Sequence, residues 1–414
     1  MYLILNKRFR FSSSHRLHVE SWSDEENARF FGGENGGKYG HGHNFETWMG
    51  IHGQVDEKTG MIVELGALKD KINTLIESRY DHKYLNVDTL PFHRLNPTPE
   101  NIAGQLLSEV APILTDEPYE LIKCQLIDIP ESSAVSFNDK TCQRTFAACF
   151  SAARVTRSPH LSEEENRKMF GLSANPEGHG HNYRIEITLA GKPDSKHGLI
   201  KSEVETWQTL NEFVKRWDHK NLNTEVSDFK NIPITTECMA RVIFEKLSDK
   251  LPLKKVRLYE RSDFFAEYHR GGRFTMGIKA SFNAAHRLHS SELTDTENVE
   301  LYGKCNNLEG HGHNYDVECV VTGELDEKSG ALHDLVKLQT GLDKVLSRWH
   351  FKHLDLETEE FKTIPSTGEN IVQVLWQKLT ETLSAELWSV GLWETESNLF
   401  EIQREKPNGE LERK

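Results

Sequence analysis

Apolar and polar residues alternate over residues 315–321, as expected of a half-buried strand. One face would carry Tyr315, Val317, Cys319 and Val321, whose neighbours are mostly polar. A period of two places alternate side chains on one face of a strand. The polar, glycine-containing stretch GELDEKSG then predicts the end of the strand.

Two amphipathic helices are predicted after this loop. In the first, apolar residues recur at helical spacing from Leu335 to Trp349. The second starts near Glu369 and places Ile371 and Leu375 on one face. The stretches SVGLWET and NLFEIQR that follow are typical of strands, so we predict that this part of the chain ends with a strand pair.

The same order of motifs occurs three times along the chain. The sequence HGHN begins at His41, His179 and His311. Each occurrence is preceded by a related sequence (FSSSHRL, FSAARVT or FNAAHRL) and followed by RYDHKYLN, RWDHKNLN or RWHFKHLD. Such a long period indicates tandem copies of one domain.

We divide the chain into three domains, each with the predicted order strand, strand, helix, helix, strand, strand. The boundaries are predicted at 1–140, 141–271 and 272–414. The glycine-rich sequence RGGR at 270–273 marks the second joint. These domains are called copies one, two and three below.

Composition indicates a globular protein and argues against several kinds of partner. Apolar residues make up 37% of the 414 residues and the formal net charge is −14, so a general nucleic-acid or membrane-surface binder is not expected. No apolar run reaches the length of a membrane span, about 20 residues, and the start lacks a signal-peptide layout. The six cysteines form no CxxC pair, which favours reduced thiols and a cytoplasmic protein.

Two sets of three histidines have the spacing of a metal site. The two histidines of HGH point to one face of a strand, and a third comes from a neighbouring strand. The sets are His286, His311 and His313 in copy three, and His15, His41 and His43 in copy one. Zinc is the expected metal, because three protein ligands with one open position are typical of catalytic zinc.

The matched spacing of the two sets supports this hypothesis. A single HxH would more often be a pair of ordinary polar residues at a strand end. In copy two, Arg154 stands where the third histidine would be. We therefore expect His179 and His181 to be structural remnants and the chain to hold two complete metal sites.

A single cysteine accompanies the histidines of copy three. Cys305 lies six residues before His311, and the other copies carry Asn35 and Ser173 at this spacing. A thiol near a zinc ion can act as a base in proton transfer. Because a lone cysteine is more often a small buried residue, the hypothesis depends on the histidine pair beside it.

An aspartate precedes a histidine in copies one and two but not in copy three. The residues at these positions are Asp81 and His82, Asp218 and His219, and His350 and Phe351. A carboxylate beside an imidazole can orient it and tune it for proton transfer. Surface Asp-His dipeptides are common, so the pair by itself is weak evidence for catalysis.

The motifs FNAAHRL, GKCNNLEGHGHNY, DHKNLN and TGEN together resemble those of the 6-pyruvoyltetrahydropterin synthase family, which includes the bacterial 6-carboxytetrahydropterin synthases. The resemblance covers nearly the whole chain, three times. It implies an α+β architecture of three tandem tunnelling-fold (T-fold) domains, each a four-stranded antiparallel sheet with two helices. One chain would then form a pseudo-trimeric, twelve-stranded barrel, and two chains would stack as a homodimer.

The resemblance also implies a reaction and the residues that serve it. A zinc-dependent lyase would eliminate triphosphate from 7,8-dihydroneopterin triphosphate to give 6-pyruvoyltetrahydropterin, in tetrahydrobiopterin biosynthesis. Cys305 would be the base, an Asp-His pair of the adjacent unit would complete a proton relay, and a glutamate would anchor the pterin ring. The implied substrate-binding residues are Glu394, Glu260, Thr98 and Glu100. At the anchor position copy one offers Asp128 with an apparent one-residue insertion, which puts its pterin anchoring in doubt.

Three alternatives stay open at this point. A 6-carboxytetrahydropterin synthase of the queuosine pathway would use the same substrate. A non-catalytic pterin-binding T-fold protein would bind a pterin but would have lost catalytic activity. A retro-aldol activity at the histidines of copy one would use Glu34 in place of the thiol.

The three copies lack different parts of the implied site, which predicts that each site is formed by two neighbouring copies of the ring. Copy three keeps the metal-binding half of a site and copy two keeps the Asp-His half, while copy one keeps its Asp-His pair and its histidines. If the metal half of copy three faces copy one, both losses fall in one abandoned site. We therefore predict a complete site formed by Cys305 with Asp81 and His82; the opposite order would use Asp218 and His219.

Overall fold

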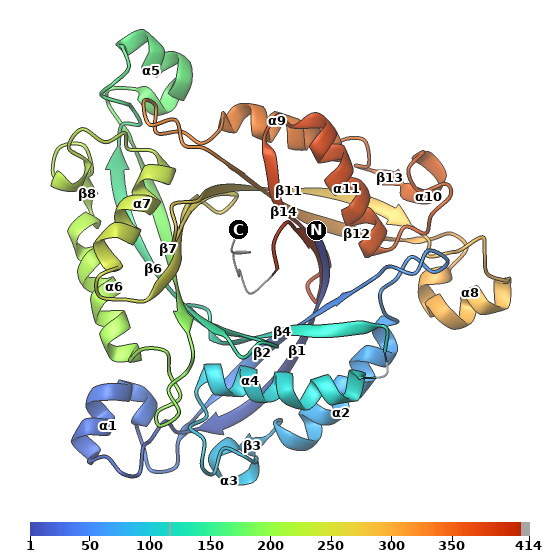
Figure 1. Ribbon diagram of the computed structural model, residues 1–414. Coiled ribbons are helices and arrows are strands. Elements are labelled where there is room, and N and C mark those ends of the chain that lie inside the picture. The colour runs from blue at the N-terminus through green and yellow to red at the C-terminus, as the bar shows by residue number, and fades with distance from the viewer. Residues whose placement is uncertain (116, 407–414) are drawn as a thin grey trace.

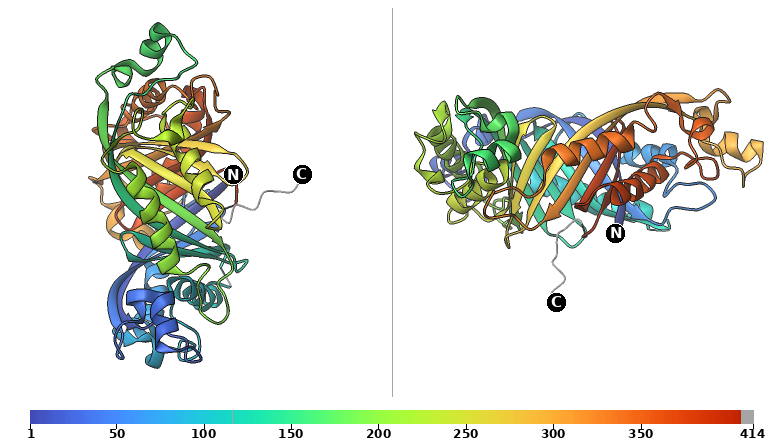
Figure 2. Two further views of the ribbon diagram at one scale, coloured as in Figure 1. Left: turned by 90° about the vertical axis from the view of Figure 1, so that its left-hand side faces the viewer. Right: turned by 90° about the horizontal axis from the view of Figure 1, so that it is seen from above.

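Three similar units surround a closed β-barrel, with the helices on the outside (Figure 1). The computed structural model describes residues 1–115 and 117–406. Seen from the side, the ring is wider than it is tall and its strands are tilted (Figure 2). Among the described residues, no helix has the length and apolarity needed to cross a membrane.

The units repeat the predicted order of elements. The first comprises β1 (Tyr2–His15), α1 (Asp24–Phe31), η1 (Gly32–Asn35), β2 (His41–Gly53), α2 (Leu65–Arg79), β3 (Lys83–Tyr84), α3 (Leu85–Asp88), α4 (Pro99–Val110), η2 (Ala111–Leu114), β4 (Tyr119–Ile129) and β5 (Ser132–Phe137). The second comprises β6 (Cys142–Arg154), α5 (Glu163–Phe170), η3 (Gly171–Ala174), β7 (His179–Gly191), α6 (Glu203–Trp217), β8 (Lys220–Asn221), η4 (Ser227–Phe229), α7 (Thr236–Leu247), β9 (Leu253–Arg261) and β10 (Phe264–His269). The third comprises β11 (Phe274–His286), α8 (Asp295–Tyr302), η5 (Gly303–Asn306), β12 (His311–Gly323), α9 (Leu335–Leu346), β13 (Lys352–His353), α10 (Leu354–Glu357), α11 (Gly368–Thr382), β14 (Glu386–Thr395) and β15 (Asn398–Gln403).

Twelve long antiparallel strands close the barrel, which confirms the predicted pseudo-trimer. Their order is β10-β9-β7-β6-β5-β4-β2-β1-β15-β14-β12-β11, and β10 pairs with β11 to close the ring. The units are joined where the last strand of one pairs with the first strand of the next: β5 with β6, β10 with β11, and β15 with β1. The three two-residue strands pair in parallel with β1, β6 and β11.

The outer face of the barrel is apolar because it carries the helices. On β12 the alternating residues Tyr315, Val317, Cys319 and Val321 are all buried, as their pattern predicts. They belong to one core cluster with residues of α9 and α11. This packing holds β11 and β12 in place. The histidines lie at the end of β11 and the start of β12, which are called the outer ends of these strands below.

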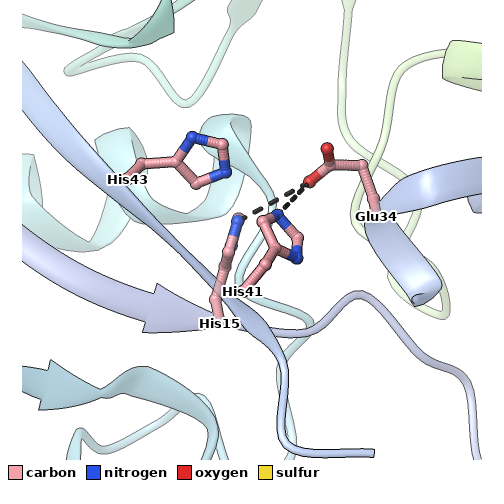
Figure 3. A group of neighbouring side chains, drawn as sticks. All are labelled: His15, Glu34, His41 and His43. Atoms are coloured by element: carbon pink, nitrogen blue, oxygen red, sulfur yellow. Dashed lines mark hydrogen bonds and ion pairs between the residues drawn. The ribbon is translucent and has the colours of Figure 1, made fainter. Parts of the chain in front are cut away.

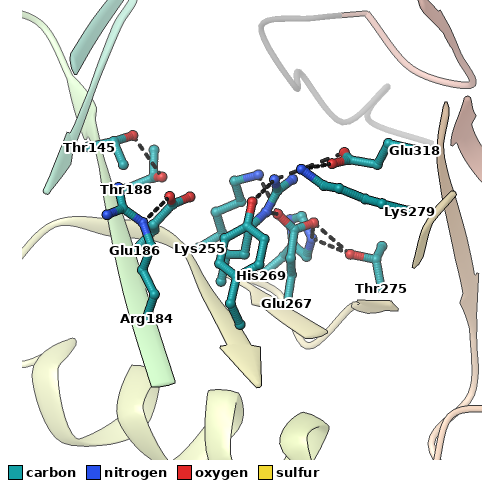
Figure 4. Close-up of polar contacts among 12 residues, drawn as sticks. Thr145, Arg184, Glu186, Thr188, Lys255, Glu267, His269, Thr275, Lys279 and Glu318 are labelled. Carbon is teal, nitrogen blue, oxygen red and sulfur yellow. Dashed lines mark hydrogen bonds and ion pairs between the residues drawn. The ribbon is translucent and has the colours of Figure 1, made fainter. Parts of the chain in front are cut away.

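The inner face of the barrel carries a cluster of polar side chains (Figure 4). Glu267 of β10 accepts hydrogen bonds from Lys255 Nζ at 2.5 Å, Arg257 Nε at 2.7 Å and Thr275 Oγ1 at 2.7 Å. Thr275 lies on β11 and the two cations lie on β9. The cluster therefore ties copies two and three together at the seam between β10 and β11.

Replacing Glu267 with alanine should lower the free energy of unfolding by about 3–5 kcal/mol, because it leaves two partly buried cations without their buried partner. Urea unfolding monitored by circular dichroism measures this. Asp263→Ala on the same hairpin removes the half-exposed partner of Arg261. It should cost less than about 1 kcal/mol. Equal effects of the two changes would show that the interior cluster does not stabilise the seam.

A short helix between the first two strands of each unit was not predicted. These helices are α1, α5 and α8, and each begins with a capping box in which a hydroxyl and a glutamate bond each other's backbone N–H groups. The signal was present in the sequence as SDEE, SEEE and TDTE. The last of the three leads directly into η5, which carries Cys305.

Candidate active site

The three histidines of copy three converge at the outer ends of two paired strands. His286 ends β11, opposite His311 at the start of β12, and His313 follows on the same face. Their ligand atoms all lie within 4.8 Å of one another. His286 Nδ1 donates to the Ser366 carbonyl at 2.8 Å, so its Nε2, 3.1 Å from His311 Nε2, is left to bind a metal. Burial lowers the pKa of His286 to about 4, which keeps the ring neutral, as a metal ligand must be.

Copy one contains the same cluster with a carboxylate added (Figure 3). His15 Nδ1 donates to the Pro97 carbonyl at 2.8 Å, as His286 does to Ser366. Glu34 Oε2 lies 3.0 Å from His41 Nε2 and 3.6 Å from His15 Nε2. The buried Nε2 atoms of His15 and His43 have no hydrogen-bond partner. These atoms fit a metal ion, and here Glu34 can supply a fourth protein ligand.

Copy two has a guanidinium in place of the third imidazole. Arg154 is buried and pairs with Glu260, which also contacts His181 Nε2 at 3.1 Å. His179, His181 and Glu260 still form a group that could hold a metal. Although burial alone would raise the pKa of Glu260, the Arg154 charge and the hydrogen bonds to the carboxylate lower it well below its ordinary value. The positive charge of Arg154 disfavours a metal ion at this position.

Cys305 is joined by a backbone hydrogen bond to the segment that follows His286. It sits in η5, is partly exposed, and its carbonyl accepts a hydrogen bond from the Leu288 N–H, two residues after His286. Burial raises the pKa of the thiol, and the charge of Glu394 raises it further.

Between copies three and one lies a stretch without strand pairing, called the opening below, above a short hairpin. β12 begins at His311 but pairs with β14 only from Asp316 onward. β1 continues to His15 but pairs with β15 only as far as Lys7. The outer ends of β12 and β1 therefore flank the turn between β14 and β15. Glu394 lies in this hairpin, at an irregularity in the strand register.

Glu394 is oriented through an asparagine that contacts the neighbouring unit. Asn398 Nδ2 donates to Glu394 Oε2 at 3.3 Å, and Asn398 Oδ1 accepts from Lys7 Nζ of copy one at 2.6 Å. Lys7 was not predicted as a site residue. Its relation to Glu394 depends on pairing between β1 and β15, which brings Lys7 to Asn398, 391 residues later in the sequence.

The Asp-His pair of copy one lies on the edge of β1 that faces copy three. Asp81 Oδ1 accepts from the Ser12 N–H at 2.8 Å, and His82 donates its N–H to the Ser12 carbonyl. Asp81 Oδ2 lies 2.7 Å from His82 Nδ1, which orients a ring that is 83% exposed. β15 of copy three pairs with this same edge further along β1.

The other two units keep this loop conformation. Asp218 Oδ1 accepts from the Ser151 N–H at 2.9 Å, and His219 Nδ1 lies 2.9 Å from Asp218 Oδ2. In copy three, His350 Nδ1 accepts the equivalent bond from the Asn283 N–H at 3.1 Å. In copy three, His350 at the aspartate position keeps the bond to the strand but supplies no carboxylate. Phe351 at the histidine position supplies no imidazole.

Hydrogen bonds across the joints show which unit faces the metal half of each site. In copy three, Ser290 and Tyr302 donate to the carbonyls of Lys58 and Thr59 in copy one. Ser158 of copy two donates the equivalent bond to the Lys328 carbonyl of copy three, and Thr98 of copy one donates to the Gly198 carbonyl of copy two. The end of copy three that carries the histidines therefore contacts copy one, and the Asp81-His82 pair lies on the edge of copy one that faces copy three. No contact between Cys305 and the Asp81-His82 pair is present in the described residues.

Thr98 and Glu100, predicted to bind substrate, lie at the joint between copies one and two. Thr98 caps α4 and donates to the Gly198 carbonyl at 2.7 Å, and Glu100 accepts from the Ile200 N–H at 3.2 Å. The equivalent residues at the joint between copies three and one are Thr367, which donates to the Gly60 carbonyl, and Glu369, which accepts from the Ile62 N–H. Both residues lie in the sequence motif STGENIV and were not predicted as site residues.

Sequence comparison agrees with this geometry. The sequence profile of the 6-pyruvoyl tetrahydropterin synthase family matches the chain three times, over residues 4–139, 145–271 and 275–405. The chain belongs to this family. It therefore contains three tandem copies of a domain for which the family's single-copy members provide direct comparisons.

Individual members of the 6-pyruvoyl tetrahydropterin synthase family match one unit at a time. A putative 6-pyruvoyl tetrahydrobiopterin synthase of Caenorhabditis elegans is 44% identical over 128 residues, which is 30% of this chain and 91% of the relative. The human 6-pyruvoyl tetrahydrobiopterin synthase is 38% identical over 123 residues, 29% of this chain and 85% of the relative. A solved structure of the C. elegans 6-pyruvoyl tetrahydropterin synthase is 43% identical and covers 32% of this chain and 95% of its own, with a TM-score of 0.31.

Proposed function

We propose that the chain is a zinc-dependent pterin synthase with one complete active site, formed by copies three and one. Its substrate is 7,8-dihydroneopterin triphosphate, from which it eliminates triphosphate to give 6-pyruvoyltetrahydropterin. The observation that carries the proposal is the opening bordered by Cys305, three histidines and Glu394 on one side and by Asp81-His82 on the other. Membership of the pterin synthase family supports the choice of substrate.

Each residue has a chemical role in this proposal. His286, His311 and His313 would hold the zinc ion, which would supply Lewis-acid stabilisation of negative charge on substrate oxygens. Glu394 accepts paired hydrogen bonds from the aminopyrimidine edge of the pterin. Cys305 removes a proton from the substrate side chain, and His82, oriented by Asp81, donates one from the opposite side of the opening.

Mass spectrometry of the reaction products tests the proposal. Metal-replete protein incubated with 7,8-dihydroneopterin triphosphate should form 6-pyruvoyltetrahydropterin and release triphosphate. Formation of a 6-carboxy product would assign the chain to the alternative branch of the family. Unchanged substrate in the presence of bound zinc would contradict catalysis and favour the non-catalytic alternative.

Elemental analysis should find close to two zinc ions per chain, one in copy three and one in copy one. His286→Ala should lower this to one, because His286 is the buried ligand whose tautomer is fixed by Ser366. His179→Ala is the matched control in copy two and should leave two ions. Three ions in the unchanged protein, or loss of one with His179→Ala, would show that Arg154 does not exclude the metal.

A further inference from the structure

One carboxylate occupies the same structural position in all three units. Asp128, Glu260 and Glu394 each lie at a register irregularity just before the hairpin that ends their unit. Each is followed four residues later by the first residue of the next strand. Asp128 therefore aligns without an insertion, contrary to the expectation from sequence. The three residues are called the anchor carboxylates below.

The anchor carboxylate of copy one is paired with an arginine from copy two. Arg144 of β6 is fully buried, and its Nη2 lies 3.4 Å from Asp128 Oδ2 and 2.7 Å from Glu203 Oε1. Its Nε lies 3.9 Å from Glu100 Oε2. The guanidinium thus lies among three carboxylates at the joint between copies one and two.

The anchor carboxylate of copy two is also paired with an arginine. Arg154, at the other end of β6, forms an ion pair with Glu260, and Thr236 donates a hydrogen bond to the same carboxylate oxygen. Arg154 also occupies the position of the missing histidine. A single change from histidine therefore removes a metal ligand and adds a partner for the anchor.

The anchor carboxylate of copy three differs from the other two. Within residues 1–115 and 117–406, no cation lies within ion-pair distance of Glu394, which accepts a hydrogen bond from the neutral amide of Asn398. The position of Arg144 is occupied here by Leu5, which is buried and faces Phe400 across the joint. The position of Glu203, the first residue of its helix, is occupied by Leu65.

We propose that β6 closes two of the three pterin sites by placing guanidinium groups on the anchor carboxylates of copies one and two. A guanidinium presents paired N–H donors to a carboxylate, as the 2-amino-4-oxopyrimidine edge of a pterin does. A pterin entering either site would have to displace a buried charge from its partner. Each chain therefore binds one pterin, at Glu394. This inference rests on the proposed function and specifies which of the three sites takes the ligand.

The chain supplies the template for a variant that reopens copy one. Arg144→Leu combined with Glu203→Leu reproduces the Leu5 and Leu65 pair of the joint between copies three and one. It removes one positive and one negative charge, so the formal charge of the joint is unchanged. Lys71→Leu with Glu117→Leu is the matched control, because it removes a surface ion pair of the same formal charge.

Calorimetric titration with neopterin, which lacks the triphosphate, measures the number of pterin sites in metal-replete protein. We expect one per chain for the unchanged protein and the control, two for the Arg144→Leu, Glu203→Leu variant, and none for Glu394→Gln. Circular dichroism and thermal unfolding establish that each variant is folded.

The possible outcomes separate the two proposals. Two or three neopterin molecules per unchanged chain would overturn the closure of sites by β6, whether or not the double variant folds. One site that survives Glu394→Gln would overturn its assignment to copy three. A folded double variant that still binds one pterin would overturn the role of Arg144. No binding by the unchanged protein would instead contradict the proposed function, and this inference with it.

Discussion

Replacing Cys305 with alanine should lower kcat by about 10²–10⁴, the usual effect of removing a general base. The zinc content should stay at its original value, because the three histidines and the Ser366 carbonyl that orients His286 are unchanged. Steady-state kinetics with 7,8-dihydroneopterin triphosphate, together with elemental analysis of the same preparation, measures both quantities.

Cys149→Ala is the matched control for this experiment. Cys149 is an exposed thiol of β6 that lies outside the groups with metal-binding geometry. Its replacement should leave kcat unchanged. A Cys305→Ala variant that keeps full activity and full zinc would show that the thiol is not the base, and that the reaction depends on another group at the opening.

Replacing His82 with alanine should lower kcat by a similar factor, because its imidazole borders the same opening as Cys305. His219→Ala should change kcat by only a few-fold at most. The two histidines are well matched: both have a positive φ, 55° and 57°, and their side chains are 83% and 81% exposed. Their carboxylate partners are also equivalent, so only their place in the ring differs.

The two Asp-His pairs face different copies. The Asp81-His82 pair faces copy three, which carries Cys305, whereas Asp218-His219 faces copy one, which has no thiol at that spacing. A severe loss with His219→Ala and a mild one with His82→Ala would contradict the composite site. If neither His82→Ala nor His219→Ala lowers kcat while Cys305→Ala does, neither Asp-His pair takes part in the reaction.

Regular periodicity made much of the fold predictable from sequence. The alternation from Tyr315 to Val321 and the threefold recurrence of HGHN predicted the strands, the copies and the barrel. The two histidine clusters followed from a period of two within a strand and a fixed distance between strands. The pairing of Cys305 with His82 was predicted from which copies lack which half of a site, and it stays a prediction.

The features that were missed depend on contacts between units. Arg144 lies at a strand position that is apolar in the other copies, where the residues are Leu5 and Met276, and its partners are 16 and 59 residues away. Lys7 approaches Glu394 only when the first and last strands pair. A single sequence carries no direct signal for such contacts, because they arise only when the barrel closes.

A double-mutant cycle between Cys305 and His82 tests the central claim most directly. The rates of the unchanged protein, Cys305→Ala, His82→Ala and the double variant are measured under the same conditions. If the two residues of copies three and one serve one proton relay, the double variant should be little slower than the slower single variant. A loss equal to the product of the two single losses would show that the residues act independently, and would contradict a single active site shared by the two copies.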